Sequence, residues 1–354
     1  MNNIEKLQAK LTDGSCALIT SDVNRRFFTG MKSSAGVAVI FPQAAYLLVD
    51  FRYIEKAREC ACCEVIEQKK LYEQVNELLC KHNARNIMIE GGEMTVAGFD
   101  KLREGLGGEF EYNTAELSGI IEGIRAVKTS EELEKMQRAQ DIADGAFAFV
   151  TENIIEEGVT ELELARAIDF FMLSHGAEAV SFDTIALCGE NTSLPHGVPS
   201  DRKIRKGEFV LMDFGAVYEG YHSDMTRTVC VGEPTEKMRE VYNIVLEAQM
   251  KCLDYAKPGI VCKDLDAVAR DFITEKGYGD AFGHGLGHSV GMEIHESPAA
   301  NTRDTAILQE NMVMTIEPGI YLPKKFGVRI EDCIYFTENG YNNFVSSPKN
   351  LLIL

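Results

Sequence analysis

Apolar positions follow two different spacings along the first 122 residues of the chain. Short runs rich in β-branched residues predict strands at residues 17–20, 36–41, 46–49 and 87–90. Apolar residues three to four positions apart predict helices at residues 53–60, 71–82 and 95–106. This alternation predicts a small α/β domain over residues 1–122.

A different pattern covers residues 123–354. The sequence Thr129-Ser130-Glu131-Glu132 is a capping box, which predicts a helix from this point to about residue 152. Further helices are expected at residues 160–174, 236–256 and 262–276, with β segments between and after them. Long helices and strands grouped in blocks predict an α+β domain with an antiparallel sheet.

Composition narrows the classes of function. The chain has 354 residues and a formal net charge of −19. A surface with this charge repels nucleic acid and anionic lipid. The chain has no apolar run long enough to span a membrane, and its first ten residues lack the apolar centre of a signal peptide. Ten cysteines in such a chain predict reduced thiols and a cytoplasmic location. Cys60 and Cys63 have redox or zinc spacing, but no second pair follows nearby, which favours a structural role.

Asp213 and Asp224 flank a predicted hairpin turn. The segment 209–231 has two apolar stretches separated by the turn-forming residues 217–220. A turn centred between residues 218 and 219 would place the two aspartates directly opposite each other, with Cβ atoms about 4.5–5.5 Å apart. Carboxylates at this distance repel each other unless a proton or a cation lies between them. The pair indicates a metal site, and two surface aspartates beside a turn are the alternative.

Histidines are concentrated in one segment. His284, His288 and His295 fall within twelve residues, in a chain that has seven histidines, and His196 lies in a Pro-His-Gly turn. Four glycines between residues 283 and 291 make a helix improbable. On a strand, His284 and His288 share one face, whereas His295 is out of phase by one residue, so the chain must bend near Gly291. A structural role is the alternative for any one of these histidines.

Two further carboxylates end or follow apolar strands. Glu317 follows the apolar run 312–316 and precedes Pro318-Gly319, which stops the strand. In the predicted strand 327–336, Arg329 and Glu331 share a face, an arrangement in which a guanidinium can orient a metal-ligating carboxylate. A solvated strand face is the alternative.

Together these segments supply four carboxylates and one imidazole. Such a donor set suits Mn(II), Co(II) or Fe(II). Five protein ligands fit two metals about 3.5–4 Å apart.

Around these residues the sequence resembles the pita-bread metallopeptidases, which include aminopeptidase P, prolidase and methionine aminopeptidase. The matching segments are MDFG, HSDMTRT, FGHGLGHSVGMEIHE, TIEPG and VRIED, and NRRFFTG near the N-terminus resembles the accessory domain of two-domain members. The resemblance implies a pita-bread catalytic domain over residues 123–354. It also implies a dinuclear metal centre whose ligands are Asp213, Asp224, His288, Glu317 and Glu331.

The resemblance also implies roles for neighbouring residues. His196 resembles the histidine that stabilises the tetrahedral intermediate, and His295 resembles the histidine that binds substrate and passes protons. Glu317 would accept a proton from the attacking nucleophile, and His284 and Arg329 would support the ligands. The expected ions are Mn(II) or Co(II), with Zn(II) or Fe(II) as alternatives. A homodimer is implied as well.

The implied reaction is hydrolysis of the peptide bond before a proline in second position. A dipeptidase must bind the carboxylate of that proline, commonly with a cation. Some short prolidases have an arginine just after the HE-x-P segment, where this chain has Ala299 and Ala300, and its nearest cation is Arg303. We therefore expect an Xaa-Pro aminopeptidase, with an Xaa-Pro dipeptidase (prolidase) as the alternative. A metal-free binding module of the same fold is a remote alternative, because such relatives lose ligands.

Overall fold

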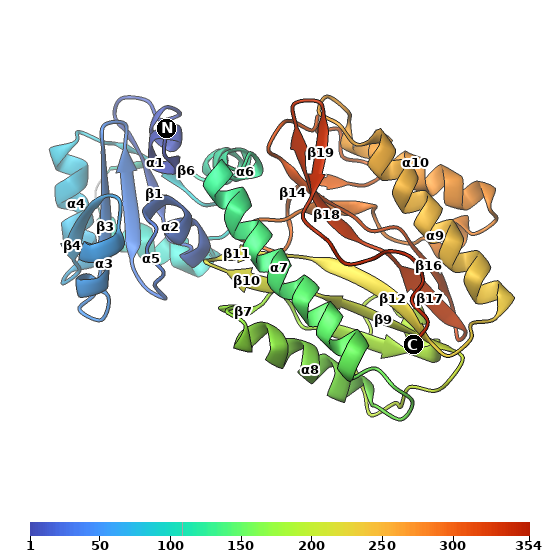
Figure 1. The fold of residues 1–354 in the computed structure, drawn as a ribbon. Coiled ribbons are helices and arrows are strands. Elements are labelled where there is room, and N and C mark those ends of the chain that lie inside the picture. The colour runs from blue at the N-terminus through green and yellow to red at the C-terminus, as the bar shows by residue number, and fades with distance from the viewer. Residues whose placement is uncertain (108) are drawn as a thin grey trace. The chain divides into compact units, whose positions relative to one another are not determined.

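The computed structural model describes residues 1–107 and 109–354, and these form two compact units, Met1–Arg125 and Ala126–Leu354. The first unit has one mixed sheet with the strand order β4-β3-β2-β1-β5-β6 (Figure 1). Its strands are β1 (Ser15–Ile19), β2 (Val37–Phe41), β3 (Ala44–Val49), β4 (Glu64–Glu67), β5 (Asn86–Ile89) and β6 (Glu111–Asn113). Its helices are α1 (Asn3–Gln8), α2 (Asp22–Thr29), α3 (Ile54–Cys60), α4 (Leu71–Lys81), α5 (Val96–Leu106) and α6 (Leu117–Ala126). The predicted α/β class of this region is confirmed.

The second unit contains four long helices. They are α7 (Ser130–Asn153), α8 (Glu161–Ser174), α9 (Glu236–Tyr255) and α10 (Cys262–Glu275). Helix α7 begins at the predicted capping box, in which the Thr129 hydroxyl accepts from Glu132 N and the Glu132 carboxylate accepts from Thr129 N. Helices α9 and α10 lie side by side against the strands (Figure 1), and their apolar faces form one core with β15, β16 and β18.

The strands of the second unit pair antiparallel in every described ladder, as predicted for this region. Those before α9 are β7 (Ala179–Val180), β8 (Ile185–Cys188), β9 (Glu208–Phe214), β10 (Ala216–Tyr218), β11 (Tyr221–His222) and β12 (Met225–Val231). Those after α10 are β13 (Gly287–Ser289), β14 (Glu296–Ala300), β15 (Val313–Ile316), β16 (Gly319–Leu322), β17 (Phe326–Arg329), β18 (Asp332–Thr337) and β19 (Gly340–Asn343). Two short 3₁₀ segments, η1 (Gly189–Ser193) and η2 (Gly279–Ala281), complete the unit.

The register of the central hairpin differs from the prediction. Asp213 pairs with Thr226, so it does not lie directly opposite Asp224. The cause is a tight two-residue turn at Glu219 and Gly220, both of which have positive φ (48° and 89°), as a type I′ turn requires. Because the register moves by two residues, Asp213 and Asp224 stay on the same face of the hairpin as diagonal neighbours.

Two predicted strands are shorter than expected. Residues 284–286 lie outside β13, which begins at Gly287, and the segment 291–295 is a series of bends. The strand predicted over residues 327–336 is interrupted, since β17 ends at Arg329 and β18 begins at Asp332. Glu331 therefore lies between two ladders and depends on other contacts for its position.

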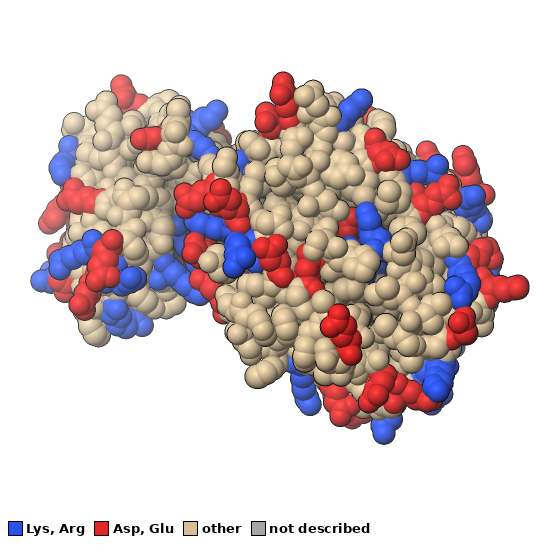
Figure 2. Space-filling view, viewed as in Figure 1, with Lys and Arg blue, Asp and Glu red and all other residues tan. Residues whose placement is uncertain are grey.

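The face drawn in Figure 2 shows Lys and Arg side chains interspersed with Asp and Glu side chains on each unit. Within the described residues, none of the helices is both long and apolar enough to cross a lipid bilayer.

Candidate active site

A cavity of about 770 Å³ lies in the second unit. Its walls include every candidate residue named from the sequence: His196, Asp213, Asp224, His284, His288, His295, Glu317, Arg329 and Glu331. These side chains come from several separate segments between His196 and Glu331. The structure therefore brings all nine into one place.

Asp213 and Asp224 come from the two arms of the β9–β12 hairpin. Asp224 is buried, and one Oδ of Asp213 accepts a hydrogen bond from Arg329 Nη2. The other oxygen of Asp213, Oδ1, is buried and has no hydrogen-bond partner among the described residues. A buried carboxylate oxygen without a donor is costly, and a cation would satisfy it.

His288, in the middle of β13, lies close to Glu317, which directly follows β15. The Nδ1 of His288 donates to Ser289 O (3.1 Å), which leaves the Nε2 lone pair available to a metal. This Nε2 lies 3.6 Å from Asp224 Oδ2 and 3.5 Å from Glu317 Oε1. One hydroxyl, that of Thr315, accepts from His288 N (3.0 Å) and donates to Glu317 Oε1 (3.0 Å).

Glu331 is held by the hairpin strand β12. Its Oε2 accepts from the Thr226 hydroxyl (2.7 Å), and its main-chain N–H donates to Thr226 O (3.1 Å). Arg329 bonds to Asp213 and, through Nε, to the Thr226 hydroxyl (2.9 Å). The guanidinium therefore contacts a different carboxylate from the predicted one. Arg329 and Glu331 nevertheless both contact the Thr226 hydroxyl and line the cavity, so the guanidinium reaches Glu331 through that hydroxyl.

The electrostatics of the cluster favour a bound cation. Burial, followed by repulsion from neighbouring carboxylates, raises the pKa of Asp224 and of Glu331 well above the usual range. Burial also raises the pKa of Glu317. Ligand atoms of Asp224, His288 and Glu331 lie within 4.8 Å of one another. A donor set rich in oxygen, with one imidazole, fits divalent first-row metals.

Three other histidines line the cavity. His284 donates through Nδ1 to Gly285 O (2.7 Å), so its Nε2 accepts from the Tyr321 hydroxyl (3.0 Å). The ring of His295 packs against that of His288 with centroids 4.4 Å apart. Burial lowers the pKa of both His284 and His295, which favours neutral imidazoles. His196 lines the wall as well.

Sequence reasoning missed three residues that shape this site: Thr226, Thr315 and Tyr321. The first two are buried threonines that position ligand carboxylates, and Tyr321 links Arg329 Nη1 (2.8 Å) to His284. Strand parity could have indicated Thr226, which shares a face with Asp213 and Asp224. Arg303 lines the cavity although it lies eight residues after His295 in the sequence.

Comparison with known proteins identifies the family. Residues 134–338, more than half of the chain, match the profile of "Metallopeptidase family M24", and residues 3–127 match "Creatinase/Prolidase N-terminal domain". The chain belongs to metallopeptidase family M24. As an M24 metallopeptidase it is a metal-dependent hydrolase with the pita-bread fold, which confirms the resemblance noted from the motifs.

Several M24 relatives match along their whole length. The chain is 40% identical to an "Xaa-Pro dipeptidase" of Pyrococcus furiosus, over 99% of each chain. A solved "Xaa-Pro dipeptidase" from Bacillus anthracis superimposes with a TM-score of 0.94 at 39% identity, over 99% of each chain. A solved "X-Pro aminopeptidase" from Thermotoga maritima gives 0.93 at 35% identity, over 98% of this chain and 100% of the other.

Proposed function

We propose that this M24 metallopeptidase is an Xaa-Pro dipeptidase, which hydrolyses dipeptides with proline second. This proposal replaces the aminopeptidase preference derived from the sequence. Similarity to proteins named Xaa-Pro dipeptidase supports it, and so does one structural observation: the wall of the cavity contains Arg303. A dipeptide carries its carboxylate on the second residue, so a cation beside the metal cluster is what its recognition requires.

Arg303 is suited to this role because its side chain is exposed on the cavity wall, and none of the described ion pairs includes it. The other cavity arginine, Arg329, is buried and bonds to Asp213 and Tyr321. Its charge is therefore already compensated within the metal cluster. Of these two arginines, Arg303 is the one available to a substrate carboxylate.

We propose that Asp213, Asp224, His288, Glu317 and Glu331 hold two divalent ions, with Mn(II) or Co(II) preferred and Zn(II) or Fe(II) as alternatives. Two such ions would lower the pKa of a water molecule towards neutrality and polarise the scissile carbonyl. The buried oxygen of Asp213 without a donor, and the raised pKa of Asp224 and Glu331, support this assignment.

The remaining groups have roles in proton transfer and charge stabilisation. Glu317 accepts a proton from the attacking water, and the Thr315 hydroxyl (3.0 Å) orients its carboxylate. His295, whose lowered pKa keeps it neutral, passes the proton to the leaving proline nitrogen. His196 donates to the developing oxyanion from the cavity wall. His284 and Arg329 orient the ligands through Tyr321 and Asp213.

These roles belong to the second unit, since all the described residues that line the cavity lie in Ala126–Leu354. We assign residues 1–122 to an accessory domain and residues 123–354 to the catalytic domain. The homodimer and the cytoplasmic location stay predictions from the sequence.

The decisive experiment compares three substrates: Gly-Pro, Gly-Pro amide and Arg-Pro-Pro. We expect protein stripped with a chelator to be inactive, and added Mn(II) or Co(II) to restore hydrolysis of Gly-Pro. Gly-Pro amide differs only at the carboxylate, so it should be cleaved poorly if that group is recognised. Asp224→Asn provides the inactive control. Cleavage of Arg-Pro-Pro with rejection of Gly-Pro would contradict the dipeptidase assignment, and no hydrolysis of any Xaa-Pro peptide with metal present would contradict the enzyme assignment.

An Xaa-Pro aminopeptidase is the second candidate. It is favoured by the similarity to the Thermotoga maritima X-Pro aminopeptidase and by alanines at positions 299 and 300. The same three substrates distinguish it, because an aminopeptidase would accept Arg-Pro-Pro and Gly-Pro amide.

A further inference from the structure

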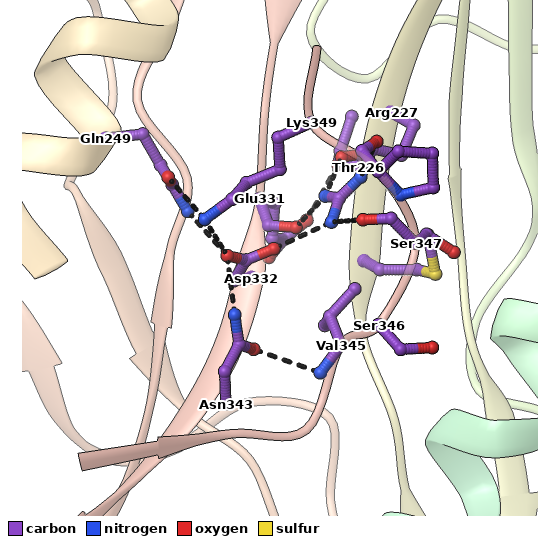
Figure 3. Close-up of polar contacts among 12 residues, drawn as sticks. Thr226, Arg227, Gln249, Glu331, Asp332, Asn343, Val345, Ser346, Ser347 and Lys349 are labelled. Atoms are coloured by element: carbon purple, nitrogen blue, oxygen red, sulfur yellow. Dashed lines mark hydrogen bonds and ion pairs between the residues drawn. The ribbon is translucent and has the colours of Figure 1, made fainter.

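Arg227, on β12, is fully buried and uses all of its guanidinium N–H groups. Its neighbour in sequence, Thr226, is the residue whose hydroxyl holds Glu331. The acceptors of Arg227 are one carboxylate oxygen and four main-chain carbonyls, those of Asp332, Thr226, Glu331, Ser347 and Pro348. Figure 3 shows this network, in which one side chain connects β12, the start of β18 and the segment that follows β19.

Asp332 is the partner of Arg227 and is equally buried. Its Oδ1 accepts from Arg227 Nη2 (2.8 Å). Its Oδ2 accepts from Gln249 Nε2 (3.0 Å), Asn343 Nδ2 (2.8 Å) and Lys349 Nζ (2.7 Å) (Figure 3). Four donors therefore fix one carboxylate, and they come from β12, α9, β19 and the segment after β19.

Glu331 directly precedes the first residue of β18 and bonds to Thr226 of β12. Since β17 ends at Arg329 and β18 begins at Asp332, Glu331 belongs to neither ladder. Its carbonyl accepts from Arg227, its N–H donates to Thr226 O (3.1 Å), and its carboxylate accepts from the Thr226 hydroxyl (2.7 Å). Arg227 also holds the Thr226 carbonyl (2.9 Å). The Arg227 guanidinium thus binds the main-chain carbonyls of both Thr226 and Glu331, the two residues whose side chains are joined by the hydrogen bond that orients the Glu331 carboxylate.

Stability alone is a weak reason for this ion pair. Burying a guanidinium and a carboxylate costs several kcal/mol of desolvation each, and apolar side chains of the same size often serve as well. Arginine is specific here in another way, because its planar fork can reach carbonyls and a carboxylate at the same time. Lysine, with one ammonium group, cannot make the same set of contacts.

We infer that the buried pair Arg227–Asp332 is a positioning device that aims Glu331 at the metal centre and couples it to the segment 343–349. The inference rests on the proposed function, in which Glu331 is a metal ligand. Groups that orient metal ligands typically change metal affinity by about 10–100-fold when they are replaced. Arg227 and Asp332 act through Glu331 and Thr226, so they are positioning residues.

The test measures metal binding directly, on protein stripped of metal. Arg227→Lys keeps the positive charge and removes the planar guanidinium group. Gln249→Met is the control, because it removes the hydrogen bonds of Gln249 to Asp332 (3.0 Å) and from Lys349 (3.2 Å), whereas none of the described hydrogen bonds of Gln249 involves Glu331 or Thr226. Binding of Mn(II) is followed by the electron paramagnetic resonance signal of the free ion, and the unfolding temperature of the metal-free protein is measured in parallel.

We expect Arg227→Lys to weaken at least one Mn(II) site by about 10–100-fold. For Gly-Pro, kcat should fall while KM changes by less than about threefold, since a misplaced ligand affects the reaction more than the binding of the substrate. Gln249→Met should lower the unfolding temperature and leave Mn(II) affinity unchanged. Wild-type Mn(II) affinity in Arg227→Lys, or an equal loss of affinity in Gln249→Met, would overturn the inference.

Thr226→Val provides a second variant should Arg227→Lys not fold. It removes the hydroxyl that donates to Glu331 (2.7 Å) and accepts from Arg329 Nε (2.9 Å), and unchanged Mn(II) affinity in this variant would also overturn the inference. A wild-type protein that binds no Mn(II), Co(II), Zn(II) or Fe(II) would instead overturn the proposed function, so the two failures are distinguishable.

Discussion

Thr315 joins two ligands of the proposed metal centre through one hydroxyl. It accepts from His288 N (3.0 Å) and donates to Glu317 Oε1 (3.0 Å), and its side chain is fully buried. Thr315→Val keeps the shape and replaces the hydroxyl with a methyl group. The neighbouring strand is very close, since a Cβ at Gly287 would lie 1.9 Å from Thr315 O. Water therefore has little room to replace the lost hydroxyl.

The magnitude follows from these two hydrogen bonds. A buried N–H left without an acceptor costs about 1–3 kcal/mol, and a hydrogen bond to a charged carboxylate contributes about 1.5–3 kcal/mol. We expect the free energy of unfolding of the metal-free protein to fall by roughly 2.5–6 kcal/mol, the sum of the two contributions. Because His288 and Glu317 also lose their orientation, Mn(II) affinity should fall by about 10–100-fold.

Urea unfolding of the metal-free protein and Mn(II) titration measure the two effects separately. Thr192→Val is the matched control, because the Thr192 hydroxyl is also buried, accepts from Gly327 N (2.8 Å) and donates to Gly189 O (2.6 Å). Both variants should lose stability, but only Thr315→Val should lose Mn(II) affinity. Equal Mn(II) affinity in the two variants would refute the idea that Thr315 orients ligands.

Three further predictions concern other parts of the chain. Arg303→Ala should raise KM for Gly-Pro by roughly three- to tenfold, because it removes a charge-assisted hydrogen bond at a solvent-exposed position, and it should leave KM for Gly-Pro amide unchanged. Steady-state kinetics, with Arg303→Lys as the control, measures both values. Lys128→Met removes the ammonium group beside the buried carboxylate of Glu296 (3.1 Å) and should cost about 3–5 kcal/mol in urea unfolding. Adding Glu296→Gln should recover part of that loss, and purely additive losses would contradict the pairing. Finally, burial raises the pKa of Cys16, Cys188 and Cys262 to about 12, so iodoacetamide followed by mass spectrometry should label exposed Cys60 and Cys80 in the folded protein and not these three thiols.

Local patterns along the chain were enough to predict most helices of the second unit. The capping box at Thr129 located the start of α7, and the helices predicted at residues 160–174, 236–256 and 262–276 agree with α8, α9 and α10 within a residue or two at each end. These features depend on neighbours a few positions apart, so the sequence contains the necessary information. The grouping of the nine site residues in one cavity was also anticipated from motif context.

The details of pairing were harder to predict. The register of the hairpin depends on the turn at Glu219, and a glutamate with positive φ is not a typical signal for a type I′ turn. The interruption of the predicted strand 327–336 at Glu331 was not predicted either. Both differences arise from backbone geometry that hydrophobic spacing does not encode.

Contacts between distant segments could not be predicted from the sequence. Thr226 and Thr315 look like ordinary strand threonines until their partners from other strands are known. Arg303 was named from the sequence only as the nearest cation after the HE-x-P segment. A turn in which Asn301 Oδ1 accepts from the N–H groups of Arg303 and Asp304 brings it to the cavity wall.

The Arg227–Asp332 pair also has a consequence for how the protein folds. It joins residues 105 positions apart, and the carbonyl of Ser347 that Arg227 binds is 120 positions away. Contacts of such long range form only after large loops have closed, at an entropic cost that local hairpins do not meet. The β9–β12 hairpin can assemble early with two of the five proposed ligands in place. Glu331 can join them only when the last strands have docked, so the ability to bind metal arises at the end of folding and marks a chain that has folded completely.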